Sequence, residues 1–172
     1  MASIGHIAVG MAAARLYPRS KISTTALAGA MGFWGALSLL PDADVIAFKL
    51  GIPYHAPWGH RGATHSFVFC IALAIVVALI ARVARLPAWR TFAVAAVVLV
   101  SHPLLDVMTD GGLGCALYWP FENTRHFAPW NPIPVAPIGK AFFSSRGLRI
   151  ALTELFIFSP LVLYALWPRR HF

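Results

Sequence analysis

The sequence predicts an all-α fold: a polytopic membrane helix bundle with about four transmembrane helices and a short buried helix at the N-terminus. Of its 172 residues, 59% are apolar and 12% are charged, whereas a typical soluble domain is about 25% charged. Several apolar stretches approach the roughly 20 residues that a membrane helix needs. The alternative is a soluble all-α protein with an unusually apolar core. The length indicates a single domain over residues 1–172.

Five apolar segments are expected to be helical, and they cover residues 4–16, 24–40, 66–84, 89–108 and 148–167. The first is too short to cross a bilayer at ~1.5 Å per residue, so we expect it to be buried within the bundle. The connections 42–65 and 109–147 are too rich in Pro and Gly to form long helices.

The second segment carries a row of small residues. Gly29, Gly32 and Gly35 are three residues apart, and Pro41 ends the segment. Small residues at such a spacing allow two membrane helices to approach closely. We therefore expect these glycines to face a neighbouring helix.

The chain is strongly basic, with a formal net charge of +8. The basic residues cluster between apolar segments and form no stripe with interleaved aromatic residues. We expect them to set membrane topology and to contact anionic lipid, and we expect no nucleic-acid partner.

Acidic residues are scarce, which makes their positions informative. The chain has six Asp and Glu residues, and three of them are Asp42, Asp44 and Asp106, at the ends of apolar segments. Ionisable groups near a membrane are expensive and tend to be kept for function. Aspartates together with histidines are typical ligands of a divalent metal ion.

His102 and Asp106 are four residues apart, so on a helix they share one face and can reach one ion. Pro103 lies between them and can distort the turn. A buried His–Asp hydrogen-bonded pair is the alternative.

Asp42 and Asp44 directly follow a helix end, where the helix dipole disfavours acids. That position favours metal binding over two solvated carboxylates.

His60 and His65 stand five residues apart, which is not a helical-face spacing, but Gly62 between them permits a turn that brings both rings together. The planar guanidinium of Arg61 suits a phosphate or carboxylate. A loop at the membrane interface is the alternative.

His6 alone is a weak candidate for a metal ligand, because a lone histidine on an apolar helix is more often hydrogen-bonded than a ligand.

Alternating helix direction places all these groups on one membrane face. The second segment ends where the third begins, and the fourth returns to that face; His6 joins them if the first helix starts there. The opposite face carries eight basic residues in short stretches: Arg15, Arg19, Lys21, Arg82, Arg85, Arg90, Arg169 and Arg170. The positive-inside rule assigns that face to the cytoplasm. We therefore expect an extracytoplasmic site in a bacterial inner membrane.

The ordered motifs resemble the YdjM family of LexA-regulated, membrane-bound proteins described as metal-dependent hydrolases. The resemblance covers roughly residues 3–125. It rests on His6, Pro41-Asp42-x-Asp44, His60-Arg61-x-x-Thr64-His65-Ser66, Ser101-His102-x-x-x-Asp106, Gly112 and Trp119-Pro120-Phe121.

A more distant resemblance is to the bacterial zinc-dependent phospholipase C group, whose members are helical and hold several zinc ions. It implies metal ligation by His6, Asp42, His60, His65, His102 and Asp106, with Asp44 as a ligand or a base. The chain departs from that group because it is membrane-embedded and has no Glu near the His-x-x-x-Asp pair.

Residues and resemblance together predict a metal-dependent hydrolase that cleaves a phosphoester, plausibly in a lipid or lipid-linked substrate. We expect one to three divalent ions, zinc foremost, with manganese or magnesium as alternatives. Asp44 would bridge ions or act as a base, and Arg61 would bind phosphate. The alternatives are a non-enzymatic metal-binding protein, such as a transport accessory or a sensor, and a structural membrane protein whose polar residues only lock helices together.

Overall fold

The computed structural model describes residues 4–18 and 22–168, whose regular secondary structure is helical, which confirms the all-α part of the predicted fold class. They contain the helices α1 (Ile4–Leu16), α2 (Thr24–Ser38), α3 (Ile46–Lys49), α4 (Phe67–Val83), α5 (Ala88–Asp106), α6 (Ser145–Ile157) and α7 (Ser159–Leu166). The short 3-10 helices are η1 (Leu40–Val45), η2 (Ala63–His65) and η3 (Gly139–Phe143). The β-structure of these ranges is limited to two isolated bridges.

Serine hydroxyls begin three of the helices. Ser23, Ser66 and Ser144 each accept a hydrogen bond from the backbone N–H three residues further on. Such a cap satisfies an N–H that has no partner within the helix and contributes about 1 kcal/mol. Ser66 matters most here, because it fixes where α4 starts immediately after His65.

Pro103 lies inside α5 without ending the helix. Proline has no N–H, so the carbonyl of Leu99, four residues earlier, loses its usual partner. The buried thiol of Cys70 on α4 donates to that carbonyl instead, over 3.3 Å. The helix therefore continues to Asp106, and His102 and Asp106 stay on one helix face.

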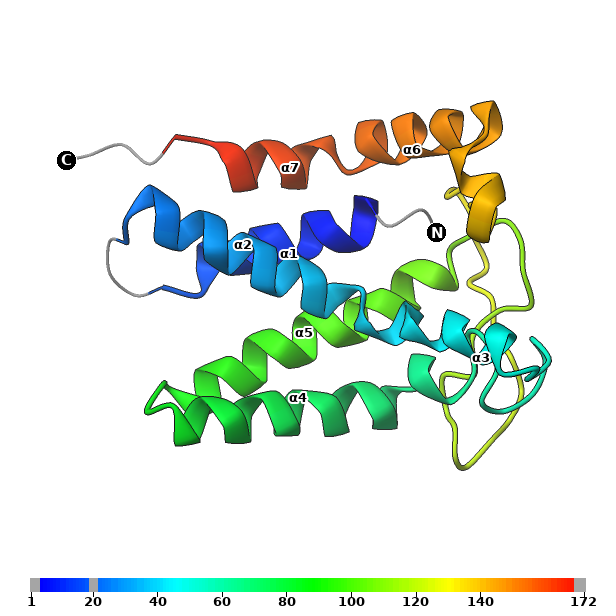
Figure 1. The fold of residues 1–172 in the computed structure, drawn as a ribbon, viewed down its shortest axis with the longest axis horizontal. Helices are drawn as coiled ribbons and strands as arrows, with labels where there is room; N and C mark the ends of the chain where they lie inside the picture. Colours follow the sequence, from blue (N-terminus) through cyan, green and yellow to red (C-terminus); the bar gives the residue numbers. More distant parts are fainter. Residues whose placement is uncertain (1–3, 19–21, 169–172) are drawn as a thin grey trace.

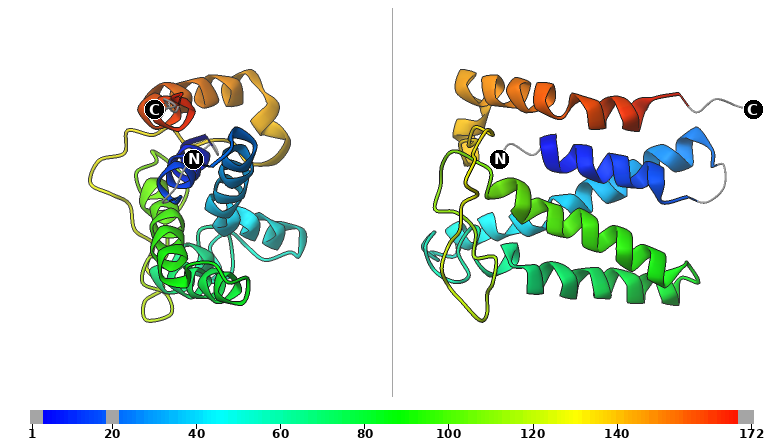
Figure 2. Two further views of the ribbon diagram at one scale, coloured as in Figure 1. Left: turned by 90° about the vertical axis from the view of Figure 1, so that its left-hand side faces the viewer. Right: turned by 180° about the vertical axis from the view of Figure 1, so that it is seen from behind.

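The helices form two antiparallel pairs, α1 with α2 and α4 with α5 (Figure 1). The end of α1 with residues 17 and 18 lies against the turn 84–87 and the start of α5, and this end of the bundle is called here the connection end. The start of α1, the ends of α2 and α5, the start of α4 and the long loops lie at the opposite end (Figures 1 and 2). That end, which carries His6, Asp42, His65, His102 and Asp106, is called the site end. α6 and α7 run beside α1 from the site end back toward the connection end (Figure 2).

Close packing of α1 on α2 depends on Gly10. A Cβ at Gly10 would lie 2.4 Å from the Trp34 carbonyl oxygen and 2.7 Å from the Cα of Gly35, so no larger residue fits without moving the backbone. An added Cβ at Gly29 or Gly32 would meet nothing within 4 Å. The expectation was thus right for Gly35 and wrong for Gly29 and Gly32, because α2 turns those two away from α1.

One described helix, α5, is both long and apolar enough to cross a membrane. Two bent pairs also qualify if each counts as one span: α2 with the η1–α3 segment, bent by 49°, and α6 with α7, bent by 66°. Pro160, in the first turn of α7, has no N–H with which to continue α6, so the segment predicted as one helix is broken. The structure supports one to three spans, and the predicted number of about four is not confirmed.

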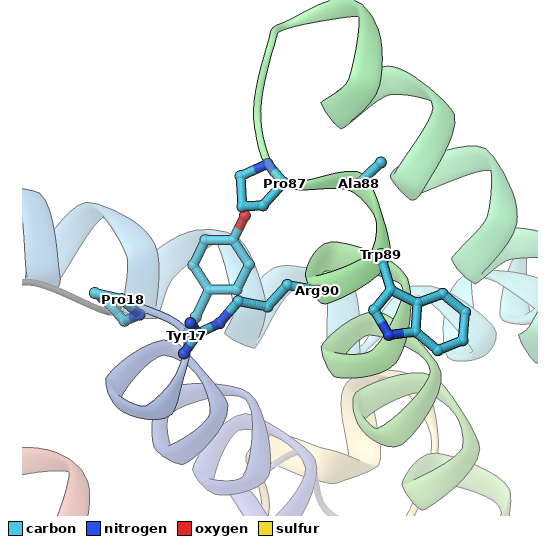
Figure 3. Close-up of a pocket in the computed structure, with 6 residues that line it drawn as sticks. All are labelled: Tyr17, Pro18, Pro87, Ala88, Trp89 and Arg90. Carbon is cyan, nitrogen blue, oxygen red and sulfur yellow. The ribbon is translucent and has the colours of Figure 1, made fainter.

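The connection end is basic, as predicted. Arg82 and Arg85 are exposed there, and Arg90 donates to the carbonyl of Leu16 over 2.9 Å. Figure 3 shows the pocket beside this contact, lined by Tyr17, Pro18, Pro87, Ala88, Trp89 and Arg90. The predicted basic residues Arg19, Lys21, Arg169 and Arg170 lie outside the described residues.

Candidate metal centre

The structure brings together the chemistry-bearing side chains of five separate segments. They come from α1, η1, the loop before η2, η2 itself and the last turn of α5, and they are His6, Asp42, Asp44, His60, Arg61, His65, His102 and Asp106. All are buried except Asp42, whose side chain is 26% exposed. Ionisable groups are buried at such a density only when they have partners.

Four of these residues form the inner cluster, defined as Asp42, His65, His102 and Asp106. One potential ligand atom from each lies within 4.8 Å of the others. His65 Nε2 is 3.5 Å from Asp42 Oδ1 and 3.3 Å from Asp106 Oδ2. Two imidazoles and two carboxylates are a donor set that suits zinc or another divalent ion.

Both imidazoles of the inner cluster point Nε2 inward. His102 Nδ1 lies 2.7 Å from the Ser38 carbonyl oxygen, which can only accept, so Nδ1 carries the proton. His65 Nδ1 lies 3.0 Å from the Thr64 hydroxyl and 3.2 Å from Asp44 Oδ2. Thr64 donates to Asp44 over 2.6 Å, so its oxygen is free to accept from His65. Such partners fix the tautomer that metal-ligating histidines need.

The two inward nitrogens are only 3.2 Å apart. If both rings are neutral, two lone pairs face each other beside two carboxylates, and that arrangement needs a positive charge. A bound cation supplies it, or an extra proton on one ring does. Burial alone lowers the pKa of His65, but contacts with the surrounding aspartates hold that pKa well above its ordinary value of 6.5.

His6 adds an orphaned polar group to this cluster. Its ring is fully buried and stacks on His102, with centroids 3.7 Å apart. Neither ring nitrogen has a hydrogen-bond partner among the described residues, although Nε2 lies 3.5 Å from Asp106 Oδ1. A buried imidazole without such a partner fits a site completed by a metal ion.

Asp44 serves as the hub of a second group with His60 and His65. Its Oδ1 lies 2.6 Å from His60 Nδ1, and its Oδ2 accepts from the Arg61 backbone N–H and from Thr64. These contacts occupy both carboxylate oxygens. In this arrangement Asp44 orients two imidazoles, in addition to any role as the ligand or base that the sequence predicts.

Arg61 is 2% exposed and sits in a left-handed backbone conformation with φ 61°. Its guanidinium contacts Asp106 Oδ1 at 3.3 Å and donates to Thr109 and to the carbonyl of Gly111. Burial opposes its charge, but Asp106 raises the pKa of Arg61 above its usual value. Arg61 thus holds a carboxylate, as its planar guanidinium allowed, and the structure identifies that carboxylate as Asp106.

Comparison with known proteins shows the family of the chain. The model of the family described as "YdjM inner membrane protein" matches residues 1–172. The chain belongs to this family. It is also 40% identical over 139 residues to the inner membrane protein YbcI of Escherichia coli strain K12, covering 78% of this chain and 80% of that one. No solved structure matches significantly, and the distant resemblance to phospholipase C is unsupported.

In this YdjM family member, sequence reasoning missed Glu154. This glutamate on α6 is fully buried, and its Oε2 accepts from the backbone N–H of Gly5 over 3.3 Å, one residue before His6. A carboxylate at a helix N-terminus is favourable for the helix dipole. The available signal was an acid in the middle of a predicted membrane helix, which is rare without a function.

Arg125 is the second residue that the sequence did not single out. Its guanidinium donates to the carbonyls of Tyr54, Ala56 and His60, over 2.9–3.2 Å. These bonds tie the loop before η2 to the long loop after α5. The position of His60 in this family member therefore depends on a residue 65 positions away, which no local sequence pattern reveals.

Proposed function

We propose that this chain is a membrane-embedded, metal-dependent hydrolase that cleaves a phosphoester. The observation that carries the proposal is the pair of inward Nε2 atoms of His65 and His102, 3.2 Å apart and flanked by Asp42 and Asp106. Both rings are held with Nδ1 as the donor, so their lone pairs are available to an ion. Membership of an inner membrane protein family supports the membrane setting.

The inner cluster would hold the first ion, with His6 as a further ligand beside Asp106. His60 and Asp44, which lie next to His65, are candidate ligands of a second ion. His65 would serve only the first ion, because its Nδ1 carries the proton. Mixed nitrogen and oxygen donors favour zinc, with manganese or magnesium as alternatives. One to three ions remain the predicted range.

A divalent ion in such a site supplies Lewis acidity to a phosphoryl group and to an attacking water. The protein residues hold and orient the donors. Asp44 fixes the rings of His60 and His65, and Arg61 fixes the carboxylate of Asp106. The unpaired Nε of Arg61 is a remaining donor beside the site, consistent with the predicted role of Arg61 in binding a phosphate oxygen.

A membrane-bound arrangement with more than one span is part of the proposal. Outward-facing apolar side chains on α4 and α5 support it, because Leu79, Ile80 and Val97 are each more than half exposed. The basic connection end would lie in the cytoplasm, and the site end would face outward. A reporter fused after Arg170 should behave as cytoplasmic; an external signal would overturn this orientation.

A non-enzymatic metal-binding protein is the alternative function. A transporter or channel carries polar groups along a path across the membrane. Here the histidines and acidic groups of the described helices gather at the site end, while the middle of α4 is apolar. That distribution favours a one-sided site over a conduit.

Metal content decides the proposal. Protein purified in detergent would be measured by elemental mass spectrometry, wild type beside the double variant His102→Ala/Asp106→Ala. We expect at least one equivalent of divalent metal in the wild type and none in the variant. Wild-type protein that stays empty after reconstitution would contradict the proposal, and metal without hydrolysis of any phosphoester would leave the non-enzymatic alternative.

A further inference from the structure

A cavity of about 620 Å³ lies directly against the metal centre. Its inner wall includes Asp42, His60 and Arg61, so it reaches residues of the site itself. Its other wall comes from α3 and from the segment that leads into η3. The volume lies within the range of ligand-binding pockets, which is about 300–1,000 Å³.

The cavity changes from polar to apolar between its inner and outer parts. The inner residues are charged or hydrogen-bonding and are mostly buried. The outer wall is apolar and exposed: Phe48 is 37% exposed, Ile138 48% and Phe143 88%. Exposed aromatic and aliphatic groups that face one cavity gain free energy when an apolar group covers them.

The charges on the cavity wall favour an anionic occupant. Lys49 ends α3, lines the cavity and is exposed, so its ammonium group is free to meet a ligand. Arg61 lies deeper, beside the metal centre. A ligand that fits both features has an anionic head at the inner end and an apolar chain toward the outer end.

We propose that this cavity holds a phosphorylated lipid, with its phosphate against the metal centre and its apolar chain between α3 and η3. Lys49 contacts the anionic head group, and Phe48, Ile138 and Phe143 contact the chain. The inference rests on the proposed function and narrows its substrate class. It predicts that a soluble phosphoester is a poor substrate, since such a ligand leaves the apolar wall uncovered.

Equilibrium binding tests the proposal with three probes on zinc-loaded protein in nanodiscs. The probes are a fluorescent long-chain lysophosphatidic acid, the corresponding monoacylglycerol without phosphate, and glycerol phosphate without a chain. We expect the lipid phosphate to bind at least about tenfold more tightly than either of the others. Equal binding of lipid phosphate and glycerol phosphate would overturn the chain site, and equal binding of the two lipids would overturn the phosphate site.

Two matched pairs of variants locate the binding. Phe143→Ser should weaken lipid phosphate binding about fivefold, whereas Phe121→Ser, at a phenylalanine 87% exposed and outside the cavity, should not. Lys49→Gln should weaken it about threefold, whereas Arg82→Gln at the connection end should not. Equal effects within either pair would overturn the assigned cavity.

Metal content measured on the same samples separates the two proposals. If the protein holds zinc but binds lipid phosphate and glycerol phosphate equally, the proposed metal centre stands and the proposed lipid cavity is wrong. If the protein cannot be loaded with metal, the proposed function is wrong, and so is the substrate class that rests on it.

Discussion

At the site end the ionisable side chains of the candidate metal centre are largely buried and contact one another, whereas at the connection end the arginines are exposed or donate to backbone carbonyls. Arg61 is 2% exposed and contacts Asp106, but Arg82 and Arg85 face outward. Solvated charges cost little and can set topology or contact lipid. Buried charges are costly and persist only where partners or function hold them. The contrast separates the charges that are proposed to orient the protein in the membrane from those that are proposed to form its site.

Removing Asp106 should be the most damaging single change at the site end. Asp106→Asn leaves Arg61 buried without its carboxylate and weakens the contacts of His6 and His65. We expect the free energy of unfolding of the metal-free protein to fall by about 3–5 kcal/mol. Denaturant titration in detergent measures this. Asp110→Asn, at an exposed aspartate, is the control, and equal losses for the two would contradict the assignment.

Changing Asp44 should weaken metal binding without abolishing it. Asp44→Asn keeps the shape of the side chain but removes the charge that holds His60 and His65. Loss of such an orienting partner lowers metal affinity by about 10–100-fold. Competition with a fluorescent chelator measures the change. Full loss of metal, equal to that of Asp42→Asn, would show that Asp44 is itself an essential ligand.

Between the two ends, the close approach of α1 to α2 depends on Gly10. Gly10→Ala places a methyl group 2.4 Å from the Trp34 carbonyl oxygen, so α1 and α2 must separate. We expect a loss of about 1–3 kcal/mol in unfolding free energy. Gly29→Ala is the matched control, since its methyl group meets nothing, and it should be neutral or stabilising by up to about 1 kcal/mol. The reverse order would contradict the packing.

The pH dependence of metal-free protein should report on His65. Its pKa is raised above 6.5 in the folded state, so its stabilising contribution is complete below about pH 6.5. That contribution falls as the pH rises through the folded pKa, by at most about 1.4 kcal/mol per pH unit. Metal-loaded protein should show the opposite trend, because protons compete with the ion. Thermal unfolding at several pH values, with and without metal, tests both.

The smallest effect is expected at the connection end. Arg90→Gln removes a partly exposed hydrogen bond to the Leu16 carbonyl and should cost about 0–1 kcal/mol. Metal content should not change. A loss of metal in this variant would mean that the two ends are coupled and that the contrast between them is too simple.

Much of the candidate site followed from the sequence because helix direction alternates. Asp42 ends one apolar segment, His65 precedes the next, and Asp106 ends another, so antiparallel packing brings them to one end. The four-residue spacing of His102 and Asp106 likewise predicted a shared face. The ligand roles of these residues are still predictions that metal analysis must test.

Other features depended on contacts that sequence spacing does not encode. Glu154 reaches Gly5 across 149 positions, and Arg125 reaches His60 across 65. Gly10, and not Gly29, carries the close helix contact because the rotation of α2 is set by packing. The break between α6 and α7 at Pro160 turns one predicted membrane helix into a pair bent by 66°.

The sequence by itself determined the helical class, the membrane character, the family resemblance and the end of the bundle at which the histidines and aspartates gather, because hydropathy and helix direction are local properties. The tertiary structure decided the orientation of each imidazole, the burial of Arg61 and the cavity beside the site. Those features depend on which carbonyl, hydroxyl or carboxylate lies next to each group in space, and Ser38, Thr64 and Asp44 take those places only after the chain has folded.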